Sequence, residues 1–550
     1  MVTLGSTRPK LRVPGTTETR SGPIRRRIRL PRGRNLVHDL TLSDICSEHR
    51  RRYPHTLAVI DGDKRYTWTE LDDRVSRAVN VLRSHGVGRG DRVLWAAQSS
   101  SRFLELMLAC ARIGAMICPA NWRQSAAEFA FVVEDFDPKV VFWQSEEIGE
   151  QVLGARGLAS SQAVWINHDL HDEHGYEHLL SQASSGDVEF EVDPHDPLLV
   201  IYTAAHSGRP AGSMLSHRNL ISMALQTARV SEVSEESVFV NSGPLFHIGN
   251  FQFDSLPVLI AGGTNVYIRR VDEPELLELI AKERVTSAFL MPPTILRMKE
   301  LNEAAGLDIS SLRGGAFSAY WGDMLPPDST RGSVHPGGFG QTEVCGLSIL
   351  NGYGGKGIGN SGRPVPLCQV RIVDAAGAEV ADGSTGEIIV RGDTVHLGYW
   401  NRPDENARRM VKGWWHTTDI GRREADGTIT FLGTMTRMIK SAAENIYPPE
   451  VETCLVGHPA IKQAAVIGVP DPRFTQSVKA VVVLEDGHNV SEAELIDFCR
   501  ARIASYKKPK AVVFVAELPR SGGVTDYDAL DAEFGGGGYP GGNNLSGMKV

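Results

Sequence analysis

Short apolar runs alternate with longer amphipathic segments through the first 220 residues, and this alternation limits the fold more than any other feature. Three apolar runs have the length and composition of buried strands: 91–97, 139–142 and 198–201. Residues 103–114 and 126–135, which lie between these runs, have the spacing of amphipathic helices. Strands that alternate with helices form parallel sheets covered by helices. The sequence therefore predicts an α/β fold.

The composition argues against several classes of protein. Of the 550 residues, 23% are charged and 41% hydrophobic, as in soluble globular chains. A net charge of −8 does not favour nucleic acid or an anionic membrane as a partner, and no apolar run approaches the roughly 18 residues of a membrane span. The seven cysteines include no Cys-x-x-Cys pair, which argues against a metal or disulfide framework. We expect a cytoplasmic protein.

Changes in composition along the chain predict four regions. Residues 1–35 are rich in arginine, proline and glycine and predict a disordered arm, with an arm that binds a partner or phosphate as the alternative. Residues 36–433 predict a large N-terminal domain. Residues 434–533 contain several strand patterns and one helix pattern and predict a small C-terminal domain. Residues 534–550 are rich in glycine and predict a flexible tail.

A loop of small residues at 202–212 follows the apolar run 198–201. A helix pattern begins just after it, at Ser216. A loop between a strand and a helix is a place where backbone N–H groups converge on phosphate. This loop has one hydroxyl in its middle, Ser207, and no lysine, so it is poor in the groups that hold a triphosphate.

Four stretches, taken in order, resemble the adenylate-forming family of acyl-CoA synthetases, peptide-synthetase adenylation domains and luciferases. They are the loop, Gly338-Phe339-Gly340-Gln341-Thr342-Glu343, Gly413-Trp414-Trp415-His416-Thr417-Thr418-Asp419, and Ser441-Ala442-Ala443-Glu444-Asn445-Ile446-Tyr447-Pro448. The resemblance implies a large adenylate-forming domain with parallel sheets covered by helices and a small, mobile α+β domain. It also implies an acid–thiol ligase, which joins an acyl group to coenzyme A through an acyl-adenylate.

The resemblance assigns roles around the nucleotide. Phe339 would stack on adenine, Thr342 would bind the α-phosphate, and Glu343 would hold Mg²⁺ when a polyphosphate is present. Asp419 would accept hydrogen bonds from both ribose hydroxyls. The remaining predicted adenylate-binding residues are Gly315 and Ala316, whose small size lets a purine lie against the backbone, Gly340 and Arg437.

Further roles concern the acyl group and the thiol. The family has a Pro-Leu-Phe-His run at the acyl pocket, which implies that Phe246 and His247 gate the path toward the thiol, with Met291 in the pocket wall. The predicted tunnel for coenzyme A comprises Ser441, Ala442, Ala443 and Glu444. The family has glycine at the two alanine positions, so the tunnel would be narrower here. A carrier-protein thiol stays open as an alternative.

This chain departs from the family mainly where the family handles ATP. The loop keeps Thr203, Gly208, Pro210 and Gly212, but the family serine, first glycine and first threonine are Ala204, Ala205 and His206, and its lysine is Ala211. The family arginine after Gly433 is Thr434, for which Arg437 would compensate. The family lysine near the C-terminus is missing, since no lysine occurs between Lys510 and Lys549. These losses resemble the non-adenylating acyl-CoA ligases of platensimycin- and platencin-type natural product pathways.

The sequence therefore predicts an enzyme that binds a preformed acyl-AMP and transfers its acyl group to coenzyme A. Stabilising charge on the phosphates is the task of the lost groups, whereas transfer needs the adenylate site and the thiol path. His247, Thr342 and Glu343 are the predicted catalytic residues. A separate adenylating ligase would supply the acyl-AMP, and Mg²⁺ would be used only with ATP. The sequence does not identify the acyl group, and it leaves a homodimer open as the oligomeric state.

Two alternatives remain at this point. The first is a complete ATP-dependent acyl-CoA synthetase in which other cations replace the lost ones: Arg209, Lys440, Lys507 or Lys508. The second is a non-catalytic homologue that binds acyl-adenylate or acts as a scaffold.

Overall fold

The computed structural model describes residues 40–540 apart from 171, 187–189, 204–209, 356, 436, 443 and 522–523, and apart from the side chain of Ala316. The predicted N-terminal arm lies outside the described residues. So do Ala443 of the predicted tunnel and the loop positions Ala204, Ala205, His206 and Ser207.

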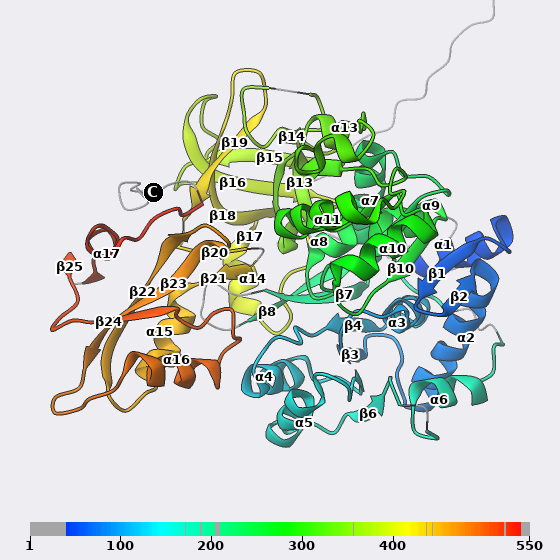
Figure 1. Cartoon of the computed structure of the whole chain (residues 1–550), viewed down its shortest axis with the longest axis horizontal. Coiled ribbons are helices and arrows are strands. Elements are labelled where there is room, and N and C mark those ends of the chain that lie inside the picture. Colours follow the sequence, from blue (N-terminus) through cyan, green and yellow to red (C-terminus); the bar gives the residue numbers. More distant parts are fainter. Residues whose placement is uncertain are drawn as a thin grey trace, which may run out of the picture. The chain divides into compact units, whose positions relative to one another are not determined.

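A six-stranded sheet in the order β6-β5-β3-β4-β7-β8 forms one half of the large domain (Figure 1). Its strands are β3 (Arg92–Ala96), β4 (Met116–Pro119), β5 (Val140–Trp143), β6 (Val164–Asn167), β7 (Pro197–Thr203) and β8 (Ala211–Ser216). All neighbours are parallel except β7 and β8. The helices between these strands are α3 (Ser101–Ile113), α4 (Ala126–Phe136), α5 (Gly149–Leu158) and α6 (Tyr176–Gln182). The predicted α/β class is confirmed.

A second, five-stranded sheet has the order β11-β9-β10-β1-β2 and is parallel except for β2. Its strands are β1 (Leu57–Asp61), β2 (Lys64–Thr67), β9 (Val238–Asn241), β10 (Thr264–Tyr267) and β11 (Ser287–Ala288). The accompanying helices are α1 (Leu42–Arg52), α2 (Trp68–Ser84), α7 (His217–Ser231), α9 (Leu256–Ala261), α10 (Glu273–Glu283) and α11 (Pro292–Ala305). Trp68, Trp95 and Phe103 belong to one apolar cluster contributed by both sheets and their helices.

The loop at 204–210 joins two antiparallel strands, so the expected strand, loop and helix arrangement is wrong. Thr203 of β7 pairs with Ala211 of β8, and β8 extends to Ser216 before α7 begins. Ser216 then caps α7 by accepting from the N–H of Asn219. The helix N-terminus therefore lies a whole strand away from the loop along the chain, and the positive end of that helix does not directly follow the loop.

No strand is found among the described residues directly before the predicted adenylate residue Gly315. Residues 306–314 contain turns and irregular backbone, and Gly315–Phe317 form a short 3₁₀ turn. Strand β11 is limited to Ser287–Ala288, and α11 starts soon afterwards at Pro292. Proline fits the first turn of a helix, because its missing N–H would have no partner there.

Two antiparallel sheets carry the predicted adenylate motifs. The first contains β12 (Gly338–Gln341), β13 (Gly346–Leu350) and β14 (Arg363–Pro364). The second contains β15 (Cys368–Val373), β16 (Thr385–Gly392), β17 (Met410–Val411), β18 (Trp414–Arg423) and β19 (Ile429–Thr434). In the pairing of β18 with β19, Asp419 lies opposite Thr434.

The C-terminal residues form a smaller domain with its own sheet, in which β21-β20-β23-β22 are joined by β24 beside β23 (Figure 1). The strands are β20 (Ile439–Ser441), β21 (Glu444–Ile446), β22 (Ile461–Asp471), β23 (Thr475–Leu484) and β24 (Ala511–Phe514). Helices α15 (Pro448–Val456), α16 (Glu492–Arg500) and α17 (Tyr527–Phe534) accompany them. The exact division at 433/434 stays a prediction.

The glycine-rich tail packs onto this small domain as far as residue 540, so the expectation of a flexible tail is wrong for that part. Tyr539 is 4% exposed. Its hydroxyl donates to Asp531 over 2.8 Å and accepts from the Gly468 N–H over 2.9 Å. The Gly537 N–H donates to the Gly468 carbonyl over 2.9 Å, and the Gly537 carbonyl accepts from Gln476 Nε2 over 2.6 Å. A buried tyrosine thus anchors a segment whose composition alone suggests disorder.

Among the residues that the structure describes, no helix is long and apolar enough to cross a membrane.

Candidate active site

The end of the loop and the Thr-Glu motif meet at one buried carboxylate. Glu343 is 6% exposed, and its Oε1 accepts from the Thr203 hydroxyl over 3.1 Å and from the Tyr399 hydroxyl over 2.8 Å. Thr203 ends β7, and Glu343 lies in the 3₁₀ turn Thr342–Val344 directly after β12. Thr342 opens this turn and is half-buried. The part played by Tyr399 was not predicted from the sequence.

A second buried carboxylate, Asp419, lies on β18 of the other antiparallel sheet. It is 9% exposed, and its Oδ2 accepts from Gln341 Nε2 over 2.9 Å. Trp415 in turn donates its indole N–H to Gln341 Oε1 over 2.9 Å, which fixes the orientation of the amide. Asp419 is thereby held by a residue of the β12 motif. Neither Gln341 nor Trp415 was assigned a role from the sequence.

Burial raises the pKa of Asp419 to about 7. The hydrogen bond from Gln341 and the nearby cation of Arg409 oppose this shift, whereas the carboxylates Glu343 and Glu387 add to it. Asp419, the predicted ribose ligand, therefore changes its charge near neutral pH.

Three other predicted adenylate-binding residues lie on β12 and on the turn at 315. Phe339 is buried, with its ring 5.4 Å from that of Phe431 at 30°. Gly340 approaches the Gly346 carbonyl so closely that a Cβ would lie 1.8 Å from the oxygen, which explains the need for glycine. The Gly315 N–H donates to Asp328 Oδ2 over 3.0 Å. No contact within the described ranges joins Gly315 to Asp419.

The predicted acyl gate contacts the small domain through one arginine. Phe246 is buried and packs edge-on against Trp122, with ring centroids 6.5 Å apart. The Arg123 guanidinium lies 5.8 Å from the centre of the Phe246 ring and pairs with Glu444 over 3.2 Å. The gate residue and the predicted tunnel residue therefore share Arg123, which sequence reasoning missed.

His247, Phe253 and Phe289 converge on Gly249. A Cβ at Gly249 would lie 3.5 to 3.6 Å from all three side chains. The rings of Phe253 and Phe289 stack at 5.8 Å and 24°. Met291 lies at the start of α11, and the described contacts do not bring it to His247. The aromatic pair, found only in the structure, adds to the predicted acyl site.

The predicted tunnel strand turns back on itself close to the two carboxylates. Ser441 of β20 pairs with Glu444 of β21 around Ala442, whose N–H donates to the Phe474 carbonyl over 2.7 Å. Tyr447, which follows β21, is buried, and burial raises its pKa, with Glu343 and Asp419 contributing to the same shift. Tyr447 thus links the segment after β21 electrostatically to Glu343 and Asp419.

Several cations suggested as replacements are already paired. Arg437 forms ion pairs with Asp528, over 2.9 Å, and with Asp531, so its predicted contact with the adenylate would require those pairs to break. Lys507 lies between Glu128 and Glu450, with the ammonium 2.8 Å from Glu128.

Three suggested cations remain: Lys508, Arg209 and Lys440, which donates to Asn445 over 2.7 Å. Lys508 is half-buried and donates to the Ser505 carbonyl over 3.1 Å. Arg209 lies outside the described residues. The suggestion that Lys507 or Lys508 supplies the lost charge is therefore not supported by their contacts.

Glu343 is the one carboxylate of the site that is predicted to bind a magnesium ion. Glu343 already accepts two hydrogen bonds at Oε1, and within the described part of the chain no three His, Cys, Asp or Glu side chains form a metal cluster. Magnesium prefers six oxygen ligands and often takes several from phosphates. Glu343 thus fits an ion that arrives with a nucleotide polyphosphate.

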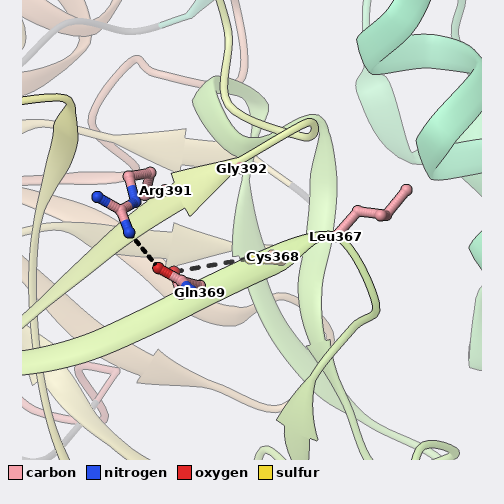
Figure 2. Close-up of a pocket in the computed structure, with 5 residues that line it drawn as sticks. All are labelled: Leu367, Cys368, Gln369, Arg391 and Gly392. Carbon is pink, nitrogen blue, oxygen red and sulfur yellow. Dashed lines mark hydrogen bonds between the residues drawn. The ribbon is translucent and has the colours of Figure 1, made fainter. Parts of the chain in front are cut away.

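A pocket of about 470 Å³ lies elsewhere, on the sheet formed by β15 and β16. Figure 2 shows that Arg391 and Gln369 are hydrogen-bonded to each other across it, while Leu367 points away from them. Its lining contains none of the predicted site residues. We therefore place the candidate site at Glu343 and Asp419.

Comparison with known proteins shows the family of this chain. The AMP-binding enzyme family matches residues 46–400, and the AMP-binding enzyme C-terminal domain matches residues 450–523. The chain belongs to the AMP-binding enzyme family. It is an enzyme of the acyl-CoA ligase type in the adenylate-forming superfamily, and acyl-CoA ligases of this family use ATP, Mg²⁺ and coenzyme A.

Among the relatives, a feruloyl-CoA synthase from Amycolatopsis is 34% identical over 478 residues, which cover 86% of this chain and 94% of that protein. An indoleacetate–CoA ligase from Aromatoleum aromaticum is 32% identical over 493 residues, covering 88% and 96%. The structure of an o-succinylbenzoate CoA synthetase from Bacillus subtilis, at 24% identity, superimposes with a TM-score of 0.73 and covers 90% of this chain and 98% of that one. This likeness shows the fold.

Two backbone positions have a conformation that suits glycine although neither residue is glycine. Thr418 has φ +60° and Ala442 has φ +53°, and the family resemblance implies glycine at position 442. A side chain in the left-handed region costs about 1–2 kcal/mol, and a β-branched residue is a stronger outlier. Strain is therefore stored directly beside Asp419 and in the predicted tunnel.

Replacing Thr418 by glycine is expected to raise the free energy of unfolding by about 1 kcal/mol, because the Cβ clash is removed. It should also weaken adenosine binding, because Asp419 becomes less firmly placed. Thr475, with φ +70° in the small domain, is the matched control: T475G should stabilise similarly and leave adenosine binding unchanged. Urea unfolding and calorimetry measure both. Lower stability of T418G would contradict the assignment of strain.

The pKa of Asp419 predicts how nucleoside binding depends on pH. Only the carboxylate accepts both ribose hydroxyls, so affinity for adenosine should fall as the pH drops through about 7. Between pH 8 and pH 6 the expected loss is about tenfold. Adenosine is the probe because it has no phosphate that titrates in this range. In D419N the binding should be weak and flat with pH, and an unchanged pH profile in D419N would refute the role.

Proposed function

We propose that the protein transfers an acyl group from a preformed acyl-adenylate to the thiol of coenzyme A, and that it forms the adenylate from ATP weakly or not at all. In this transfer the carbon–sulfur bond forms and the bond between the acyl carbon and the phosphate oxygen breaks. AMP leaves, and the proton of the thiol passes to phosphate or to water. A separate adenylating ligase would supply the acyl-adenylate, and the cytoplasm would be the compartment.

The observation that carries the proposal is the pairing of Thr434 with Asp419. The family arginine would stand at this position, directly across the β18–β19 ladder from the predicted ribose carboxylate. A buried threonine supplies a hydroxyl there and no positive charge. Ala211, at the family lysine position, is likewise buried against the core that contains Phe339. Losing one stabilising donor typically lowers a rate by about 10²–10³.

The groups predicted to serve the transfer are retained in this chain. Asp419 and Gln341 are placed for the ribose, Thr342 for the α-phosphate, and Phe339 for the base. His247 and Phe246 face the acyl side, and Arg123 links that side to Glu444 on the thiol side. Catalysis here consists of holding acyl-adenylate and thiol in line, with AMP as a good leaving group.

An aromatic acyl group fits the acyl side. Phe253 and Phe289 stack beside His247 and offer a flat apolar wall. The two relatives described above are named for feruloyl and indoleacetate groups, both aromatic. Coenzyme A is the expected thiol substrate, and a carrier-protein thiol is the alternative. The test below distinguishes the two.

The second candidate is a complete ATP-dependent acyl-CoA synthetase. It is favoured by the names of the relatives and by Lys440, which lies on β20 beside the tunnel turn and whose pKa is lowered by burial. In that case Glu343 would hold Mg²⁺ together with the phosphates of ATP.

The test compares two reactions of the purified full-length protein. In the first, synthetic feruloyl-AMP, indoleacetyl-AMP or benzoyl-AMP is mixed with coenzyme A or with a carrier protein. In the second, the free acids are mixed with Mg-ATP and the same thiols. Thioester formed from an adenylate should exceed thioester formed from acid and ATP by at least about 10². Thioester is measured by mass spectrometry, and ATP–pyrophosphate exchange is measured in parallel.

D419N is the control variant and should lose the transfer from every adenylate. Robust pyrophosphate exchange by the wild type would establish the complete synthetase instead. If no adenylate gave thioester and no exchange occurred, the non-catalytic homologue would be the correct interpretation.

A further inference from the structure

A buried arginine, Arg409, contacts β18, the strand that carries Asp419. It ends helix α14 (Pro403–Arg409) and is 6% exposed. The chain then forms β17 and returns as β18 through a two-residue turn at Lys412 and Gly413, both with positive φ. Such a turn suits a tight hairpin. It brings Arg409 next to the residues that lead into Asp419.

The guanidinium is fixed by that strand. Its Nε donates to the His416 carbonyl over 2.8 Å, and its Nη2 donates to the Thr417 carbonyl over 3.0 Å. Its central carbon lies 4.7 Å from the centre of the Trp415 ring. A planar guanidinium that stacks on an indole ring and donates to two carbonyls is a well-ordered cation.

Its charge is only partly neutralised by its own helix. The closest acidic partner is Glu405, 3.8 Å from Nη1, and Glu405 also pairs with Arg408. Buried charges need partners in order to offset the cost of losing water. The other charged groups within electrostatic reach include Asp419, whose pKa the cation lowers. Thus Arg409 and Asp419 act as counter-charges.

Two contact routes lead from Arg409 to Asp419. Trp415, on which the guanidinium stacks, donates to Gln341, which donates to Asp419. The Thr417 carbonyl accepts from Arg409 and also, over 3.3 Å, from the same Gln341 amide. Both routes end on the hydrogen bond that orients the carboxylate.

We propose that Arg409 is a positioning residue for the ribose of the adenylate, supplying from beneath β18 the positive charge that is missing at Thr434. It does not touch the ligand. It holds Trp415 and Gln341 in place and keeps a cation beside Asp419, so that the carboxylate is oriented toward both ribose hydroxyls. This inference rests on the proposed function, since it takes Asp419 as the ribose ligand.

The test measures binding of adenosine and of 2′,3′-dideoxyadenosine to the full-length protein by calorimetry. The dideoxy compound lacks the two hydroxyls, so the ratio of affinities reports the contact with Asp419. Wild type should prefer adenosine by at least about tenfold, as expected for a hydrogen bond to a charged group. In R409M this preference should fall to about twofold or less, while binding of the dideoxy compound changes by less than about twofold.

Two further variants separate charge from packing. R409Q keeps donors for the two carbonyls without the charge and should lose the preference as R409M does, which also covers the case in which R409M does not fold. R409K keeps the charge and should retain most of the preference. Arg408, whose side chain is 71% exposed, gives the matched control, and R408M should leave both affinities unchanged.

Each outcome bears on a separate claim. Equal losses for the two nucleosides in R409M and R409Q would mean that Arg409 is only structural, and an unchanged ratio would mean that it has no role. Either result overturns this inference and leaves the proposed function intact. A wild type without any preference for adenosine would instead refute the role of Asp419, which belongs to the proposed function.

Discussion

The site depends on a carboxylate that is held away from water. Asp419 lies where three strands meet: its own strand β18, β12 through Gln341, and β19 through Thr434. Burying a charge is costly unless donors and cations compensate for it. The Gln341 amide supplies the donor, and Arg409 supplies the cation. The geometry of the nucleotide site therefore follows from how one acidic side chain is satisfied.

Two residues near this carboxylate and in the tunnel turn have a backbone conformation that their side chains disfavour. Thr418 and Ala442 both have positive φ, one beside Asp419 and one in the tunnel turn. Cβ atoms at such positions cost free energy, and strained residues of this kind tend to occur at functional sites. This backbone shape indicates that the adenylate and thiol surfaces are constrained, while the positions that serve ATP in the family have changed in chemistry.

Much of the fold could be predicted because the spacing of hydrophobic residues and the length of each segment distinguish strands from helices. The buried strand at 198–201 and the helix at 126–135 were expected, and motif order brought Thr203, Glu343 and Asp419 to one site. Strand β8 was missed because Ala211 and Gly212 are typical of a loop, and only pairing with β7 makes them extended.

Other features depend on tertiary contacts that leave no local signal. Tyr539 is surrounded by glycines in the sequence, yet its hydroxyl finds partners in two distant elements. Arg409 follows another arginine near the end of a helix, a position typical of solvent-exposed residues, and only the β17–β18 hairpin buries it. Phe253 and Phe289 lie 36 positions apart, and their stacking depends on the kinked segment after His247.

The central claim is that the site uses acyl-adenylate and does not make it. Native mass spectrometry tests this most directly, on the full-length protein incubated without coenzyme A, either with an aromatic acid and Mg-ATP or with the corresponding synthetic acyl-AMP. We predict a bound acyl-AMP mass only in the second sample, and its loss as acyl-CoA when coenzyme A is added. A bound acyl-AMP mass formed from the acid and ATP would contradict the account.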